Sequence, residues 1–217
     1  MIGSTTGKST VKLAAPFAYA AGATGILANL FLIALYAQLG LQAGGAGGQT
    51  PLGPAGELVG PANDLVGSLA TAFMIPVALA LGRHLPHRRS AFITQAAGLT
   101  SMAFLTVGGP LLVLGVLAFE VQTPLAVAAY IVLSLWLFLI NRWLLRSAAL
   151  LPRVARFGVF VGAGTLAGYV VVGLGFMLPW MSWPQLAVFG VGLLIGLPAW
   201  LSIPVWFLLL GRNLGKS

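Results

Sequence analysis

The sequence contains no cysteine and only three acidic residues, and charged residues of both signs make up 6% of its 217 positions. The absence of cysteine excludes disulfide bonds and thiolate metal sites. Soluble globular domains carry about 25% charged residues, because their surface faces water. So few charged side chains exclude a soluble fold. Intrinsic disorder is excluded as well, because it requires low hydrophobicity and 59% of this chain is hydrophobic.

The hydrophobic residues gather in six long runs. A helix needs about 20 apolar residues to cross the hydrocarbon core of a bilayer, and each run approaches or exceeds this length. Strands of a membrane barrel are disfavoured, since the runs lack two-residue alternation and are about twice as long as a barrel strand. The sequence therefore predicts one all-α domain over residues 1–217, a bundle of six transmembrane helices. The spans are expected at residues 14–39, 65–83, 91–118, 124–142, 157–179 and 186–210.

Glycine and proline mark the segments between the runs. Residues 42–63 hold seven glycines and three prolines, which predicts a flexible outer loop. Glu120 to Thr123 is expected to form a tight turn, with Thr123 as the N-cap of the next helix and Pro124 at its first position. Pro184 is expected to enter the last helix in the same way.

Three short patterns suggest other features and do not meet their requirements. Residues 1–30 could be a secretory signal, but the apolar run after Lys12 is too long and no small-x-small cleavage pattern follows it. Residues 3–10 read GSTTGKST, with three residues between the glycines where a phosphate loop has four. His84 and His87 have no carboxylate on their side of the membrane to complete or orient a metal site. We expect no metal and no cofactor.

The charged residues sort by segment. With six spans, four segments lie on one side of the membrane and contain every basic residue of the chain: Lys8, Lys12, Arg83, Arg88, Arg89, Arg142, Arg146, Arg153, Arg156, Arg212 and Lys216. Glu57, Asp64 and Glu120 fall on the other side. The positive-inside rule then places both termini in the cytoplasm, an N-in/C-in topology. One arginine at mid-membrane costs about 2.5–3.5 kcal/mol, so the arginine-rich segment 142–156 is not part of a span.

This sorting also accounts for the net charge of +8. In a soluble protein such a charge would suggest nucleic acid as a partner, whereas here it orients the chain in the membrane. We expect the basic segments to attract anionic lipid headgroups by about 1 kcal/mol per residue. The excess of arginine over lysine and the richness in alanine, glycine, leucine and valine fit a high-GC bacterium, so the predicted location is the bacterial plasma membrane, that is, the cell inner membrane.

Small residues and prolines punctuate the spans. Helices in lipid associate through close packing of small residues and interhelical hydrogen bonds, so the fifth and sixth spans are predicted to form a tight pair. The glycines of that pair are Gly158, Gly162, Gly164, Gly168, Gly192 and Gly196. Proline removes a backbone hydrogen bond and kinks a helix, and such breaks can either be packing kinks or face a binding cavity. The hinge or cavity candidates are Pro76, Gly108, Gly109, Pro110, Pro198 and Pro204.

The second and sixth spans end alike, in Ile75-Pro76-Val77 and Ile203-Pro204-Val205 followed by leucine-rich residues, glycine and arginine. The odd-numbered spans share a start rich in small residues. One hypothesis is three tandem helical hairpins in parallel orientation. The alternative is that apolar sequences with a common charged ending look alike by chance.

With these boundaries, no span interior contains an ionisable residue. Proton pumps and ion-coupled transporters keep such residues at depth, and intramembrane enzymes need histidine, paired aspartates or a metal there, so we expect no enzyme. The three acidic residues have no basic residue on their side to pair with. Simple hydration is one interpretation. The other is a shared site of Asp64 and Glu120 for a cation or for the basic patch of a partner.

Two segments resemble uncharacterised six-helix bacterial integral membrane proteins, grouped as families of unknown function. They are Leu151-Pro152-Arg153 before a glycine-rich span, and Pro204-Val205-Trp206 continuing to Gly211-Arg212-Asn213-Leu214. The resemblance implies a six-helix fold and no activity. We therefore expect first a non-catalytic subunit or assembly partner, which could be a homo-oligomer. The alternative is a small transporter or channel for a neutral or lipophilic compound, with a cavity at the kinks, and a membrane enzyme is least favoured.

Overall fold

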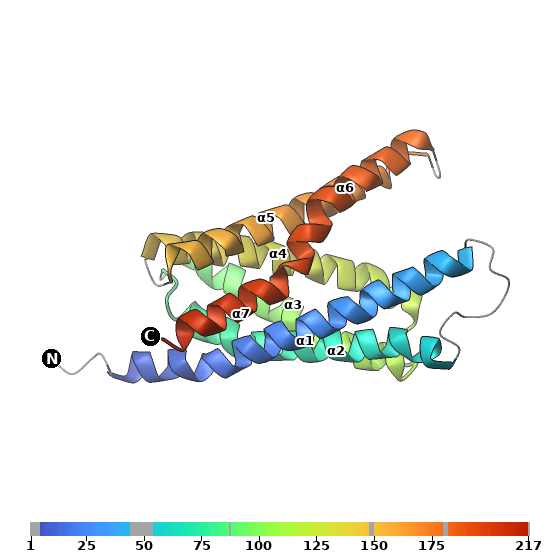
Figure 1. Ribbon diagram of the computed structural model, residues 1–217. Coiled ribbons are helices and arrows are strands. Elements are labelled where there is room, and N and C mark those ends of the chain that lie inside the picture. The colour runs from blue at the N-terminus through green and yellow to red at the C-terminus, as the bar shows by residue number, and fades with distance from the viewer. Residues whose placement is uncertain (1–4, 44–53, 87, 148–149, 180–181, 217) are drawn as a thin grey trace.

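The computed structural model describes residues 5–216 except 44–53, 87, 148–149 and 180–181 (Figure 1). Of residues 5–11, 36, 38–43 and 54–56 only the backbone is described. Every regular element in these segments is a helix, as expected. The helices are α1 (Thr5–Ala43), α2 (Pro54–Gly82), α3 (Arg89–Val113), α4 (Phe119–Ser147), α5 (Pro152–Gly175), α6 (Trp183–Leu201) and α7 (Ile203–Leu214).

Within the described residues, six helical segments are long and apolar enough to cross a membrane, which agrees with the expected number. They are Lys12–Leu35, Glu57–Gly82, Arg89–Val113, Phe119–Ser147, Pro152–Gly175 and Trp183–Leu214, the last formed by α6 and α7 together. Large apolar side chains are exposed on all of them. The architecture is therefore compatible with a multi-pass membrane protein, because those side chains would otherwise face water.

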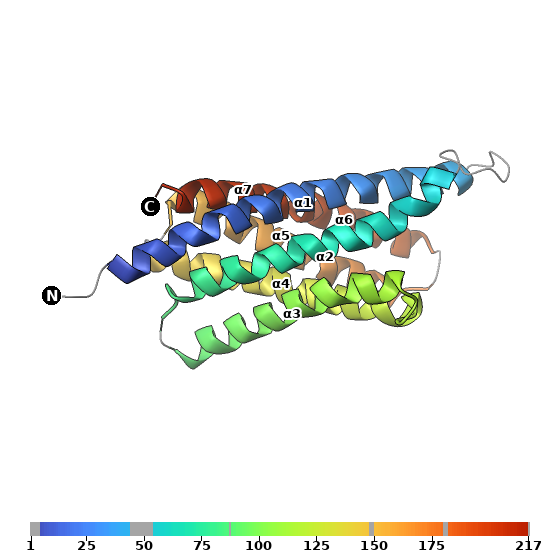
Figure 2. The same cartoon turned by 90° about the horizontal axis from the view of Figure 1, so that it is seen from below.

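The helices form a ring in which each packs against the next along the chain (Figures 1 and 2). The contacts of α1 with α2 and of α5 with α6 are the most extensive, and α7 closes the ring by packing on α1. The start of α1 and the end of α7 lie at the same end of the bundle (Figure 1). The hypothesis of three tandem hairpins stays a prediction.

Residues 54–63, expected in the flexible loop, instead form the first turns of α2. Pro54 suits a first helical position because its missing N–H would have no partner there, and Glu57 in the first turn favours the positive end of the helix dipole. Extensive packing of α2 against α1 then outweighs the poor helix propensity of Gly60 and Pro61. Residues 44–53 of that predicted loop lie outside the described residues.

The turn expected at Glu120–Thr123 lies earlier, at residues 114–118, and the third span ends at Val113 instead of 118. Gly115 has a φ of 70°, a conformation that glycine adopts without strain, and its N–H donates to the carbonyl of Leu112 at 3.0 Å. The chain can therefore reverse here, and α4 begins at Phe119. Thr123 is not an N-cap, because Thr123 and Pro124 lie inside the first turns of α4.

The fifth span begins five residues earlier than predicted, since Pro152 occupies the first turn of α5. The expectation for the last turn is confirmed. Ser182 caps α6 by accepting from the backbone N–H of Gln185 at 3.3 Å, and a proline follows at the helix start.

The last span breaks at Ser202, between α6 and α7. Pro204 has no N–H to donate one turn back to Trp200, so the helical ladder is interrupted there. The amide of Asn29 on α1 donates to the carbonyl of Leu201 at 3.5 Å, and the Ser202 hydroxyl donates to the carbonyl of Pro198 at 2.7 Å. Side chains thus supply hydrogen bonds at the break. The other predicted hinge prolines, Pro76, Pro110 and Pro198, lie inside continuous helices.

The glycines of α5 face two partners, not one. A Cβ on Gly164 would lie 2.7 Å from that of Ala199, and one on Gly168 would overlap the Cα of Gly196 across the α5–α6 contact. On α6, a Cβ on Gly192 would lie 2.7 Å from the side chain of Val172.

By contrast, Gly158 and Gly162 face α4, where added side chains would overlap Asn141 and meet the backbone of Phe138 at 2.5 Å. The expectation that all six glycines join α5 to α6 is therefore wrong for these two. The α5 helix is packed between α4 and α6, because small residues on two of its faces allow close backbone approach on both sides.

We predict that Gly168→Leu destabilises the fold by about 1–3 kcal/mol or prevents folding, because the new side chain must displace the backbone of α6. Gly173→Leu on the same helix is the matched control, since nothing lies within 4 Å of a Cβ there. The measurement is thermal unfolding of the purified protein in detergent. Equal melting temperatures for the two variants would contradict the close α5–α6 contact.

Candidate functional site

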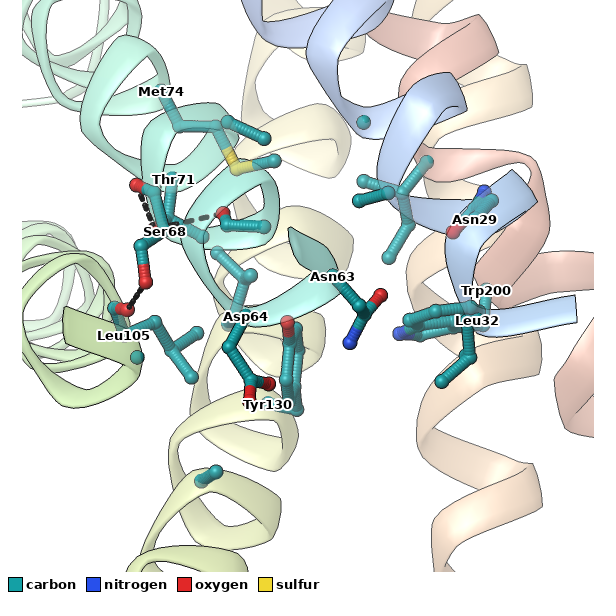
Figure 3. A pocket seen from close by; sticks show the side chains of 18 of the residues that line it. Asn29, Leu32, Asn63, Asp64, Ser68, Thr71, Met74, Leu105, Tyr130 and Trp200 are labelled. Carbon is teal, nitrogen blue, oxygen red and sulfur yellow. Dashed lines mark hydrogen bonds between the residues drawn. The ribbon is translucent and has the colours of Figure 1, made fainter. Parts of the chain in front are cut away.

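A cavity of about 300 Å³ lies inside the ring, in the half of the bundle where α2 and α4 begin (Figure 3). Its lining comes from all seven helices and includes Asn29 of α1, Asp64 of α2, Gly109 of α3, Tyr130 of α4, Tyr169 of α5, Trp200 of α6 and Pro204 of α7. Most of the remaining lining is aliphatic. This combination of apolar walls with a few convergent polar groups is typical of small-molecule sites.

Asp64 is the one charged residue of the lining. Because α2 begins at Pro54, Asp64 lies ten residues inside the helix and within the apolar segment Glu57–Gly82. The expectations that it starts the second span, and that no span interior contains an ionisable residue, are therefore wrong. The side chain is half-buried and hydrogen-bonds to Asn63. Figure 3 shows both side chains directed from α2 into the cavity.

Hydroxyl groups fix α2 against α3 at one wall of the cavity. The Ser68 hydroxyl donates to the carbonyl of Leu105 at 3.0 Å (Figure 3). The hydroxyls of Thr71 and Thr106 lie 3.2 Å apart. Gly109 allows this approach, since a Cβ there would lie 2.5 Å from the carbonyl oxygen of Asp64. The carboxylate therefore projects from a wall that side-chain hydrogen bonds and a close helix contact hold in place.

Two aromatic rings, in contact with each other, also line the cavity. The centroids of Tyr130 on α4 and Trp200 on α6 lie 6.4 Å apart, with the ring planes at 74°. This edge-to-face arrangement is one that aromatic pairs prefer. In Figure 3 the Asp64 side chain lies on the Tyr130 side of the cavity and Asn63 is directed toward Trp200. The Thr123 hydroxyl oxygen also belongs to this lining and is buried without a hydrogen-bond partner.

The cavity does not continue through the bundle. Beyond Met74, toward the end where the termini lie, large side chains fill the interior, among them Trp206 of α7 and Trp136 of α4. The indole N–H of Trp136 donates to Gln95 of α3 at 3.0 Å, and the Gln95 amide donates to the carbonyl of Ala78 on α2 at 2.7 Å. A single glutamine thus ties three helices together. The Oδ1 of Asn141 is buried in this half without a hydrogen-bond partner, so the floor under the cavity is held by the filled interior and by the Gln95 bridge.

Among the predicted hinge or cavity residues, Gly109 and Pro204 line the cavity, and Pro76, Gly108, Pro110 and Pro198 do not. Glu120 is exposed at the first turn of α4 and is not part of the cavity lining, so of the predicted pair the cavity contains only Asp64, and a shared site of the two stays a prediction.

Sequence reasoning missed several lining residues. On α2 a helical spacing could have found them, because Asn63, Asp64, Gly67, Ser68, Thr71 and Met74 share one face. Asn29, Tyr130 and Trp200 carry no local signal.

A second hollow, of about 450 Å³, lies where α2 turns into α3. Its lining includes Arg83, Arg88 and Arg89 beside Phe92. These groups suit an anionic headgroup, which is the partner expected for the basic segments. His84 is exposed next to this hollow, and His87 lies outside the described residues.

Comparison of the chain with protein-family models, curated proteins and solved structures found no match. The resemblance to six-helix bacterial membrane proteins therefore stays a prediction. The site is interpreted from its own geometry.

We predict that Gln95→Leu lowers the free energy of unfolding by about 1–2 kcal/mol, because it leaves the Trp136 N–H and the Ala78 carbonyl without that partner. Thr100→Val, on an exposed position of α3, is the control. Denaturant titration followed by tryptophan fluorescence measures the difference. A Gln95→Leu protein as stable as the control would show that the bridge contributes nothing.

Proposed function

We propose that this protein is a non-enzymatic multi-pass protein of the bacterial plasma membrane, and that its cavity binds a small amphiphilic molecule as part of transport across or within the membrane. One observation carries the proposal: a cavity of about 300 Å³ lies among six apolar spans, and polar side chains from several helices converge on it. Small-molecule sites commonly have about this volume or more.

The small residues support a binding cavity over the assembly role that we first expected. An assembly surface of the kind we expected would use the predicted packing glycines on the outside of the bundle. Here Gly164, Gly168, Gly192 and Gly196 are used between α5 and α6 of the same chain. On α1, Gly22 and Gly25 likewise pack against α7, where a Cβ on Gly25 would lie 2.8 Å from the ring of Pro204.

The contacts of α6 with the rest of the bundle support the proposal that this helix moves during transport. Its buried residues are Gln185, Gly192, Gly196 and Ala199, a single stripe whose two glycines face α5. The outer part of α6 stands away from α1 in Figure 1, and the chain is broken just after it, at Ser202. In this proposal α6 keeps its extensive contact with α5 and changes its angle to α7 at the break, because α6 and α7 share few contacts. Hinges commonly lie at such ends of elements.

The charge distribution supports an N-in/C-in orientation with the cavity in the outer half. The described basic residues lie at the end of the bundle where α1 begins and α7 ends, and the acidic residues lie in the opposite half. The cytoplasmic side attracts positive charge, so the terminal end is assigned to it.

We predict that Gly67→Phe blocks the cavity and weakens ligand binding by at least about tenfold. Gly67 lines the cavity and nothing lies within 4 Å of a Cβ there, so a ring can occupy the space without displacing backbone. The probe is adamantyl diazirine, a small neutral photoreactive compound, with the labelled residues located by mass spectrometry of the full chain in nanodiscs.

Gly190→Phe, on an exposed part of α6 with open space around it, is the control. Labelling of cavity residues that is lost in Gly67→Phe and kept in Gly190→Phe supports the proposal. Labelling spread evenly over lipid-facing residues, and unchanged by Gly67→Phe, refutes it.

We predict opposite accessibility for two single-cysteine variants. The chain has no cysteine, so Glu57→Cys and Lys216→Cys each introduce a unique thiol at an exposed position near opposite ends of the bundle. In intact cells a membrane-impermeant maleimide should label the first variant and reach the second only after permeabilisation. Labelling of the Lys216→Cys variant in intact cells would show that the C-terminus faces outward and would contradict the proposed orientation.

A further inference from the structure

We propose that the cavity is selective for an organic cation, namely an ammonium group carrying a small apolar substituent, and that Asp64 is its counter-ion. This inference deepens the proposed function and rests on it. The observation that carries it is one half-buried carboxylate facing aromatic side chains in an otherwise uncharged cavity.

Asp64 has no partner of opposite charge in the cavity lining. A carboxylate removed from water requires a partner of opposite charge or several hydrogen bonds. Asn63 supplies one hydrogen bond, and the lining contains no lysine, arginine or histidine. The basic residues of the described chain lie toward the other end of the bundle. A bound cation would supply the missing charge, whereas an anion would face repulsion from Asp64.

The walls of the cavity include aromatic rings. Tyr130 and Trp200 line the same cavity as Asp64, and the faces of such rings attract cations through their quadrupole. The attraction is strongest where water is excluded. Figure 3 shows Tyr130 next to Asp64, and Trp200 packs edge to face on Tyr130. A cation beside Asp64 and this aromatic pair would contact a carboxylate and an aromatic face together, which is the chemistry that recognises ammonium groups.

The lining suits an organic cation better than a metal ion. Calcium takes six to eight oxygen ligands, and magnesium requires an octahedral set. Asp64 provides the only carboxylate of the lining, so a divalent ion would meet a single negative charge among its ligands there. No group of three His, Cys, Asp or Glu side chains gathers anywhere in the part of the chain that the structure describes. Leu32 and Met74 instead offer apolar surface to a substituent.

The test compares two probes of the same shape that differ in charge. Benzyltrimethylammonium carries a quaternary nitrogen, and neopentylbenzene has carbon in its place. Binding of each to the full chain in nanodiscs is measured by calorimetry, with empty nanodiscs subtracted. We expect the cation to bind at least about tenfold more tightly than the neutral compound. Equal affinities, or binding only of the neutral compound, would overturn the inference.

Asp64→Asn removes the charge at constant shape, and Glu120→Gln makes the matching change at the exposed start of α4. We expect the first substitution to weaken binding of the cation by at least about tenfold and the second to leave it unchanged. An unchanged affinity in Asp64→Asn overturns the inference. So does stabilisation of the wild-type protein by sodium or magnesium chloride to the same extent as by the organic cation.

Trp200 provides a second variant pair in case Asp64→Asn does not fold, which gel filtration would reveal. Trp200→Leu should weaken binding of the cation severalfold more than Trp200→Phe, because only the phenylalanine keeps an aromatic face. Equal loss in both variants overturns the aromatic part of the site.

Gly67→Phe distinguishes a failure of this inference from a failure of the proposed function. If Gly67→Phe abolishes binding of both probes and the probes bind equally in the wild type, the cavity binds ligands without selecting cations. That result overturns the inference and keeps the proposed function. If Gly67→Phe changes the binding of neither probe, the inference and the proposed function are both wrong.

Discussion

The structure depends on the interruption of its last helix at Ser202–Pro204. Proline cannot donate the hydrogen bond that would continue the helix, so the span divides into two helices with different partners. The first part packs on α5, and the second closes the ring by packing on α1. Asn29 and Ser202 provide hydrogen bonds at the break. A straight last helix could not pack along both α5 and α1. Its side chains would then fill part of the space between these two helices.

Close packing on either side of the break decides where space remains. Glycines bring α6 onto α5, and Gly22 and Gly25 bring α1 onto α7. Toward the end with the termini, Trp136 and the side chains around it fill the interior, and Gln95 joins three helices there. The remaining volume lies in the other half of the ring, where residues of all seven helices meet. The cavity is therefore the space that remains between closely packed helices, and the bundle as a whole is not loosely packed.

Charge is distributed in keeping with this division. The packed half carries the arginines on its outer turns, and the hollow half contains the acidic residues. Of those, Asp64 alone enters the cavity, because α2 starts at Pro54 and carries it inward. The proposed cation site follows from that one shift of a helix boundary. Had the helix begun near residue 65, the same carboxylate would be hydrated at the surface like that of Glu120.

The sequence by itself determined that the chain is all-α with six segments able to cross a membrane, because apolar length and the positions of charged residues are local properties. It also indicated the glycine contacts between α5 and α6, the proline at the start of α6 and the division of charge between the ends. Only the tertiary structure decided that Gly158 and Gly162 face α4, that Asp64 faces inward, and that Asn29, Tyr130 and Trp200 meet around one space. The reason is physical: these relations join residues far apart in the chain, so they depend on how each helix is rotated, and packing against neighbouring helices sets that rotation.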